Sequence, residues 1–157
     1  MYDITAGIVV YNTKRKDLKK AVSSFLNTDL NVKLRISDNS PTDKLSQELE
    51  DFLKECEKDY GLKNIKDKVE YIFNNNNGGY GWGHNKIIEK LTDSSEKSAK
   101  SQNGKGISKY HLILNPDIYF EKGTLEKLFD YMENNPGTGQ IMPKVMYPDG
   151  ELQYLCK

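Results

Sequence analysis

The sequence lacks several features that would assign it to a broad class at once. Its 157 residues include only two cysteines and two histidines, and 23 lysine and arginine residues balance 23 aspartate and glutamate residues. This balance gives no electrostatic support for binding nucleic acid or an anionic membrane. No window approaches the roughly 18 consecutive apolar residues of a membrane span, and the first residues do not resemble a secretory signal. The length suits one domain with a three-layer α/β core.

The cysteines and histidines predict neither a disulfide framework nor a zinc site. Cys56 lies inside an amphipathic run and Cys156 stands next to the last residue, so their spacing matches no metal motif. His84 and His111 are far apart in the sequence and are interpreted as ordinary polar or strand positions. We therefore expect a protein of the reducing cytoplasm.

Hydrophobic patterns alternate between strand and helix along the chain. The β-branched run from Ile4 to Tyr11 predicts a buried strand, and further strands are expected at 32–38, 69–73 and 110–114. Apolar stripes predict helices after these strands: Leu18, Ala21, Val22, Phe25 and Leu26; Leu45, Leu49, Phe52, Leu53 and Cys56; Ile87, Ile88 and Leu91; Leu125, Leu128, Phe129 and Met132. This order predicts a three-layer α/β/α fold with a mostly parallel sheet covered on both faces.

Local signals predict some boundaries between these elements. Ser40 is expected to cap a helix that Pro41 starts and that Asp43 supports through the helix dipole. The polar segment 92–108 reads as a mobile surface insertion. Residues 139–155 read as a strand with a hairpin at Asp149-Gly150.

Short polar motifs follow the predicted strands at their carboxyl ends, where ligands bind in open parallel sheets. Asp38 would hydrogen-bond a ribose or the imide edge of a pyrimidine, or it would serve the turn "DNSP"; both interpretations stay open. In Asn115-Pro116-Asp117 the carboxylate could help to hold magnesium or manganese with diphosphate oxygens and water. The other interpretation of that motif is a simple turn that ends the strand.

The run "NNNNGGYGWGHNK", residues 74–86, is rich in glycine but matches neither well-known phosphate loop. From Gly79, the dinucleotide fingerprint needs glycine where His84 stands, and Gly104-Lys105 is followed by Gly106 in place of the serine or threonine of a Walker loop. What remains is a backbone rich in donors before a helix N-terminus, which suits a sugar diphosphate or a tight turn.

Within this run the remaining polar and aromatic residues receive ordinary interpretations. Asn74 to Asn76 are interpreted as the polar exit of the preceding strand. Tyr80 and Trp82 could stack on a ligand, but aromatic residues beside a glycine turn more often pack onto the edge of the core.

Taken in order, "IVVYN", "DNSPTD", "NNNNGGYGWGHNK", "LILNPD" and "PKVMYPDGELQ" resemble the inverting family-two glycosyltransferases, specifically the bacterial rhamnosyltransferase-like members. The resemblance runs from the first strand to residue 154. It implies the GT-A fold, a dTDP- or UDP-sugar as donor, and Mn²⁺ or Mg²⁺ as cofactor. It also implies a polysaccharide or a lipid-linked molecule as acceptor.

The resemblance assigns roles to individual positions. Asp38 resembles the carboxylate that hydrogen-bonds the base of the activated sugar, and Asp117 resembles the metal and diphosphate contact. Asn115 stands where the family's Asp-X-Asp element has its first carboxylate, an accepted variant in this subgroup. The other positions that match donor-binding elements are Tyr11, Asn12, Asn39, Asn77, Gly78, Gly79 and Asn85.

The resemblance also implies that the catalytic base lies well downstream of Asp117, beyond Lys157. The acidic residues between Glu121 and Glu151 fit a surface helix or a turn. We therefore expect residues 1–157 to form the donor-binding half of a truncated transferase, with little transfer activity alone. The longer enzyme would lie peripherally on the inner face of the membrane. The alternative is a non-catalytic nucleotide-sugar module, or a subunit completed at its apolar C-terminal edge by a partner chain or a second copy. A dinucleotide-dependent oxidoreductase is disfavoured by the missing fingerprint.

Overall fold

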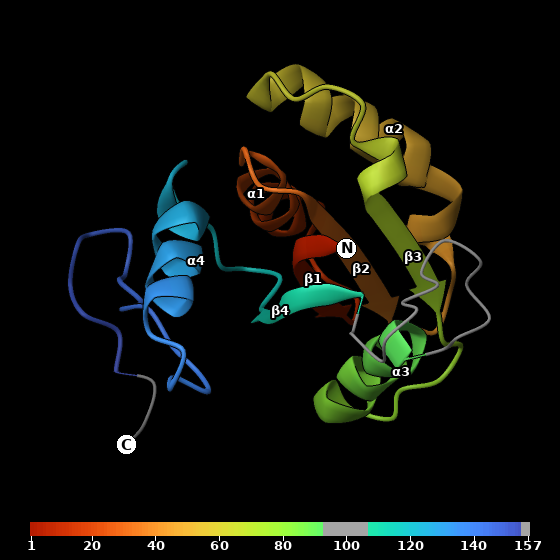
Figure 1. Ribbon diagram of the computed structural model, residues 1–157. Helices are drawn as coiled ribbons and strands as arrows, with labels where there is room; N and C mark the ends of the chain where they lie inside the picture. Colours follow the sequence, from red (N-terminus) through yellow and green to blue (C-terminus); the bar gives the residue numbers. More distant parts are fainter. Residues whose placement is uncertain (93–106, 155–157) are drawn as a thin grey trace. The chain divides into compact units, whose positions relative to one another are not determined.

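The computed structural model describes residues 1–92 and 107–154, which belong to two compact units, Met1–Glu126 and Lys127–Lys157. The first unit contains a four-stranded sheet, three α-helices and a short 3-10 helix (Figure 1). Its elements are β1 (Tyr2–Val10), α1 (Arg15–Leu26), β2 (Val32–Asp38), α2 (Lys44–Tyr60), η1 (Lys66–Lys68), β3 (Val69–Phe73), α3 (Tyr80–Thr92) and β4 (Ser108–Leu114). Helix α4 (Thr124–Asn134) spans the boundary between the units. Among the described helices, none combines the length and the apolar character needed to cross a bilayer.

The sheet has the strand order β3-β2-β1-β4, and every neighbouring pair is parallel. Val10 pairs with Asp38, and Asp38 pairs with Phe73, so the carboxyl ends of three strands lie level. The α/β fold with a parallel sheet is therefore confirmed. The level strand ends bring the polar residues that follow them to one edge of the sheet.

The two faces of the sheet differ in chemistry. Successive side chains of a strand point to opposite faces, and Figure 1 shows α1 and α2 on one side of the sheet with α3 on the other. The face toward α1 and α2 is apolar and fully buried, with Ala6, Ile8, Leu34 and Ile36 at 0% exposure. This face and the two helices supply most of the hydrophobic core.

The face toward α3 carries a layer of polar side chains. Thr5 Oγ1 lies 2.9 Å from Ser108 Oγ and 2.9 Å from His111 Nδ1. Arg35 donates from Nε to Glu70 Oε2 at 2.7 Å, and its side chain is only 2% exposed. A buried guanidinium is tolerated only when it is paired and hydrogen-bonded, so this layer requires its partners to stay in register.

Two glycines let α3 approach β1 closely. A Cβ atom on Gly83 would lie 2.7 Å from Cγ1 of Val9, and one on Gly7 would lie 2.9 Å from Cδ1 of Ile87. Both separations are shorter than atoms in contact allow, so a larger residue at either position would push the helix away from the sheet. The N-terminus of α3, with the glycine-rich turn before it, is thereby held at the carboxyl edge.

Several predicted boundaries are wrong. Helix α2 begins at Lys44 and not at Pro41, with Asp43 at its N-cap position and no side-chain cap. Ser40 does not cap it, because its hydroxyl accepts the backbone N–H of Asn12. The first strand runs from Tyr2 to Val10, and the fourth already begins at Ser108. Ile88, expected on the buried side of α3, is 41% exposed.

The predicted hairpin turn at Asp149-Gly150 is confirmed, whereas the strand predicted around it is not formed within residues 139–154. Met146 and Leu152 form an isolated antiparallel bridge around a turn in which Gly150 has a φ of +88°. Of the predicted insertion 92–108, Thr92 ends α3, Ile107 accepts the N–H of Tyr2, and Ser108 begins β4. The rest of that segment lies outside the described residues.

Candidate functional site

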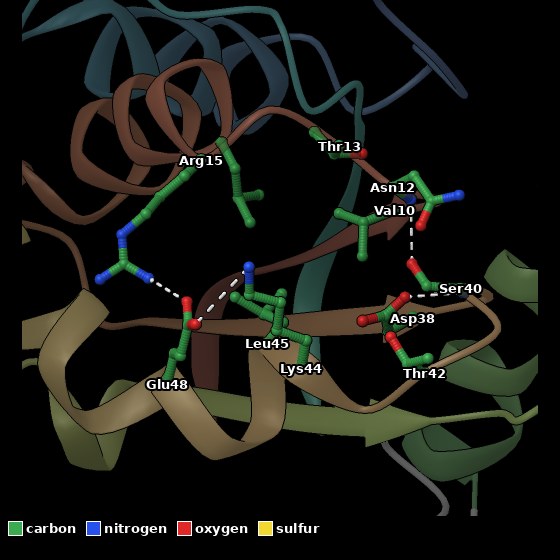
Figure 2. A pocket seen from close by; sticks show the side chains of 11 residues that line it. Val10, Asn12, Thr13, Arg15, Asp38, Ser40, Thr42, Lys44, Leu45 and Glu48 are labelled. Carbon is green, nitrogen blue, oxygen red and sulfur yellow. Dashed lines mark hydrogen bonds and ion pairs between the residues drawn. The ribbon is translucent and has the colours of Figure 1, made fainter.

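A pocket of about 330 Å³ lies at the carboxyl ends of β1 and β2, beside the first turns of α1 and α2 (Figure 2). Its volume falls within the range of small-molecule sites. Its lining residues are Val10, Asn12, Thr13, Arg15, Leu18, Asp38, Ser40, Thr42, Lys44, Leu45 and Glu48. Two residues predicted from the sequence, Asn12 and Asp38, are therefore brought together here from different strand ends.

Asp38 is held in place from both sides. It is 2% exposed; its Oδ1 accepts the backbone N–H of Ser40 at 2.8 Å, and its Oδ2 accepts the hydroxyl of Tyr71 at 2.6 Å. Burial, followed by the hydrogen bond to Asp38, raises the pKa of Tyr71, so that hydroxyl keeps its proton and donates it. A carboxylate offers about four acceptor positions, so Asp38 forms the predicted turn and still has capacity for a ligand.

Asn12 adopts a conformation that few residues accept. Its φ is +48°, in the left-handed region where asparagine is enriched. Its backbone N–H donates to Ser40 Oγ at 2.9 Å, which ties the end of β1 to the end of β2. Tyr11 is 52% exposed and does not line the pocket, although it directly precedes Asn12.

The other end of the pocket carries charged residues that no sequence pattern singled out. Figure 2 shows Arg15, Lys44 and Glu48 there, away from Asp38 and Ser40. Arg15 pairs with Glu48 at 3.1 Å and with Glu55 at 3.0 Å. The only local signal was the basic start of α1, "KRKD", which is equally typical of a solvated helix end.

Asn39 links the pocket to the glycine-rich turn. It is 2% exposed and donates from Nδ2 to the carbonyl of Gly79 at 3.0 Å. Its Oδ1 accepts from Asn74 Nδ2 at 2.7 Å, and Asn74 also donates to Ser37 Oγ at 2.7 Å. The interpretation of Asn74 as a mere polar exit of β3 is therefore wrong, because it helps to join β2, β3 and the start of α3.

Local geometry explains why glycine occupies positions 78 and 79 of the turn. A Cβ atom on Gly78 would lie 2.4 Å from Cδ2 of Trp82, so the indole packs directly on the turn. Gly79 has a φ of +91°, and its N–H donates to Asn77 Oδ1 at 3.2 Å. Asn85, one turn into α3, is exposed. Asn77 is thus exposed at the carboxyl edge of the sheet, and α3 begins three residues later at Tyr80.

The "NPD" motif lies next to the start of α3. The hydroxyl of Tyr80 donates to Asn115 Oδ1 at 2.6 Å. Burial and then the charge of Asp117 raise the pKa of Tyr80. Asn115 and Asp117 are both exposed. Tyr80 therefore connects two predicted elements, and sequence patterns alone gave no sign of that contact.

The residues fit a divalent cation only in a limited way. Among the described residues, no group of three or more histidine, cysteine, aspartate or glutamate side chains could hold a metal ion. Asp117 offers one carboxylate, and Oδ1 of Asn115 already accepts from Tyr80. Magnesium is usually bound by one or two carboxylates together with substrate phosphates and water, so Asp117 fits a cation that arrives with a diphosphate.

A pair of histidines lies beneath α3. His84 is 4% exposed, and neither of its ring nitrogens has a hydrogen-bond partner. A Cβ atom on Gly7 would lie 3.1 Å from His84 Nδ1 and 3.4 Å from His111 Nε2, which also has no partner. Burial is the main cause that lowers the pKa of both rings, and the pKa of His111 falls to about 4. Both side chains are therefore neutral near neutral pH.

Comparisons with known proteins agree with this fold. The crystal structure of S. aureus TarS 1-349 matches with a TM-score of 0.59 and 16% identity over 93% of this chain. A second structure of S. aureus TarS matches with a TM-score of 0.58 and 16% identity, also over 93% of this chain. The chain spans 40% and 24% of these two chains, respectively. No curated protein matches the sequence. Residues 5–154 match the family described as "Glycosyl transferase family 2", and because that match covers nearly the whole sequence, the chain belongs to glycosyl transferase family 2.

Proposed function

We propose that this chain binds a nucleotide-diphospho-sugar, with UDP or dTDP as the nucleotide, for inverting sugar transfer of the rhamnosyl type. The acceptor in this proposal is a cell-surface polysaccharide or glycolipid. Membership of the family supports glycosyl transfer in general. The observation that carries the choice of donor is the fixed Asp38 carboxylate in a pocket beside the strand ends.

The pocket suits a pyrimidine base. Uracil and thymine present one imide N–H, and a buried carboxylate with free lone pairs is a strong acceptor for it. Val10 and Leu18 line the same pocket and offer apolar surface to the faces of the ring. Because Tyr71 and Ser40 already hold Asp38, binding would not have to order that side chain.

The diphosphate would lie toward the start of α3. The N-terminus of a helix favours anions through its unpaired N–H groups and its dipole, and the turn Asn77 to Gly79 precedes that end. Asp117 would hold a divalent cation together with diphosphate oxygens and water. Such a cation, when bound, neutralises the charge that develops on the departing nucleoside diphosphate.

Calorimetric titration tests the proposal. UDP and dTDP are titrated with and without Mn²⁺, and ADP serves as the matched control because it has the same diphosphate but no pyrimidine imide. NAD tests the oxidoreductase alternative. We expect UDP or dTDP to bind, more tightly with Mn²⁺, and ADP and NAD to bind at least about tenfold more weakly, the equivalent of one good hydrogen bond. Failure of both pyrimidine diphosphates to bind would refute the proposed function.

A further inference from the structure

The hydrogen bond between Tyr80 and Asn115 has a defined direction. The amide oxygen of asparagine can only accept, whereas a tyrosine hydroxyl can donate, so at 2.6 Å the Tyr80 hydroxyl donates to Asn115 Oδ1. The carbonyl side of the Asn115 amide is therefore turned toward α3.

The orientation of one end of an amide fixes the other. With Oδ1 of Asn115 engaged by Tyr80, the NH₂ group points away from the tyrosine, and it has two N–H donors. Tyr80 uses one of the two lone pairs of Asn115 Oδ1, which makes this oxygen a poorer cation ligand than a free amide oxygen. A phosphate oxygen, in contrast, is a charged acceptor that suits an amide donor.

We propose that Tyr80 is a positioning residue that orients Asn115 as a hydrogen-bond donor to a diphosphate oxygen of the nucleotide, and not as a cation ligand. This inference rests on the proposed function, because it needs a nucleoside diphosphate in the site. It leaves Asp117 as the one side chain of the "NPD" motif that contacts a cation. Part of the diphosphate affinity is then independent of metal.

The position of Tyr80 is itself fixed from the protein side. Its ring makes an edge contact with the ring of His84, with centroids 4.5 Å apart and an angle of 71° between the planes. The residue before it, Gly79, is held through its carbonyl by Asn39. A side chain supported in this way can hold the exposed Asn115 amide with a small loss of conformational entropy on binding.

The test compares Tyr80→Phe with the matched control Tyr119→Phe. Tyr80 and Tyr119 are similarly exposed, at 48% and 52%, but only the Tyr80 hydroxyl contacts Asn115. Affinities for UDP and for uridine are measured with and without Mn²⁺. We expect Tyr80→Phe to leave uridine binding unchanged and to weaken UDP about fivefold to tenfold without metal, the effect of one hydrogen bond to a charged acceptor. The gain in UDP affinity from Mn²⁺ should increase, because Oδ1 of Asn115 becomes available.

Three results separate the possible failures. If wild-type protein binds neither UDP nor dTDP, the proposed function fails and this inference fails with it. If wild-type protein binds UDP and Tyr80→Phe has the same UDP affinity and the same response to Mn²⁺, only this inference is overturned. A second measurement does not depend on the folding of the tyrosine variant: the Asn115 side-chain NH₂ signals, identified in a ¹⁵N spectrum by their loss in Asn115→Ala, should shift when UDP is added without metal. Unshifted signals at saturating UDP also overturn the inference.

Discussion

In the proposed function the candidate site has a base end and a phosphate end, and these two ends are built in opposite ways. At the base end, Asp38 and Asn39 are each 2% exposed, and every bond that holds them comes from the protein. At the phosphate end, Asn115 and Asp117 are exposed. The proposed base end is therefore ordered by contacts within the protein, whereas the proposed phosphate end would rely on the ligand and its cation for order. Recognition of the base and binding of the diphosphate should respond to different substitutions.

Helix α3 connects the two ends. Its first residue, Tyr80, contacts the phosphate end, and the turn before it is bonded to Asn39 at the base end. The close approach of Gly83 to Val9 holds the helix against β1, and the buried histidines lie beneath it. Substitutions at the base end and substitutions under α3 should therefore have separable effects.

The largest effect is expected from Asp38→Asn. The amide replaces a charged acceptor at nearly constant volume, and a hydrogen bond to a charged group contributes about 1.5–3 kcal/mol, or roughly 10- to 100-fold in affinity. Uridine and UDP should lose affinity by the same factor, because the loss is at the base end. Calorimetry with both ligands measures it.

Glu48→Gln is the matched control for this substitution. It makes the same change of carboxylate to amide in the same pocket, but the Glu48 side chain is 45% exposed and lies at the charged end. Glu48→Gln should change the affinity for uridine or UDP by less than about threefold, as expected for an exposed ion pair. A UDP loss in Asp38→Asn without an equal uridine loss would contradict the separation of the two ends.

The second effect is a loss of stability in acid. The pKa of His111 is about 4 in the folded protein, below the usual value near 6.5, because of burial first and then the nearby His84 and Arg35. The unfolded chain therefore binds a proton at His111 more readily than the folded protein does. The contribution of the neutral His111 to the free energy of unfolding is present above about pH 6.5 and is lost as the pH falls toward 4. Glu70, which pairs with Arg35, faces the same layer. Between roughly pH 7 and pH 5 the wild type should lose about 2 kcal/mol more than His111→Gln.

Urea denaturation of both proteins at the two pH values measures this difference. The comparison cancels the carboxylates that both chains share, such as Glu55 and Asp59, whose pKa values are lowered by basic partners. If both proteins lose the same free energy of unfolding between the two pH values, His111 does not cause the loss of stability in acid.

A smaller effect is expected from Gly83→Ala. The added methyl would meet the side chain of Val9 at 2.7 Å, and overpacking of this kind costs about 1–3 kcal/mol, partly offset by about 1 kcal/mol of improved helix propensity. Because the helix must shift away from β1, UDP should weaken more than uridine. Thermal unfolding measures the loss of stability, and calorimetry measures the loss of affinity for UDP and uridine.

Gly81→Ala provides the control in the same helix. A Cβ atom at Gly81 meets nothing within 4 Å, so alanine should be neutral or stabilising by up to about 1 kcal/mol. If both alanine variants behave alike, the close contact between α3 and β1 does not set the position of the helix.

The elements of the fold could be predicted because their signals are local. The strands at Val32–Asp38 and Val69–Phe73 have the predicted bounds, since β-branched and apolar runs there stop at polar turn residues. The start of α2 could not be predicted in the same way. Ser40 has the chemistry of a cap, but its hydroxyl is used by Asn12, which is 28 positions away. The contact with Asn12, and not the local sequence, therefore determines that Ser40 does not cap α2.

The candidate site was predictable as a set of strand ends but not as a set of contacts. Asp38 and Asn12 were expected at one edge, and the structure brings them to one pocket. The bond from Tyr80 to Asn115 and the histidine pair depend on the register between β1 and β4 and on the approach of α3, which no periodicity contains. Roles of these residues in donor binding stay predictions.

The level register of Val10, Asp38 and Phe73 has a consequence for how the chain tolerates insertions and deletions. Because side chains alternate along a strand, one residue added inside β2 would turn Asp38 toward α3 and place a neighbour in the pocket. One residue added after a strand end would lengthen only a connection, at a small entropic cost. Length changes in this sequence should therefore be confined to the loops at the carboxyl edge, where they alter the rim of the pocket and leave the fixed carboxylate in place.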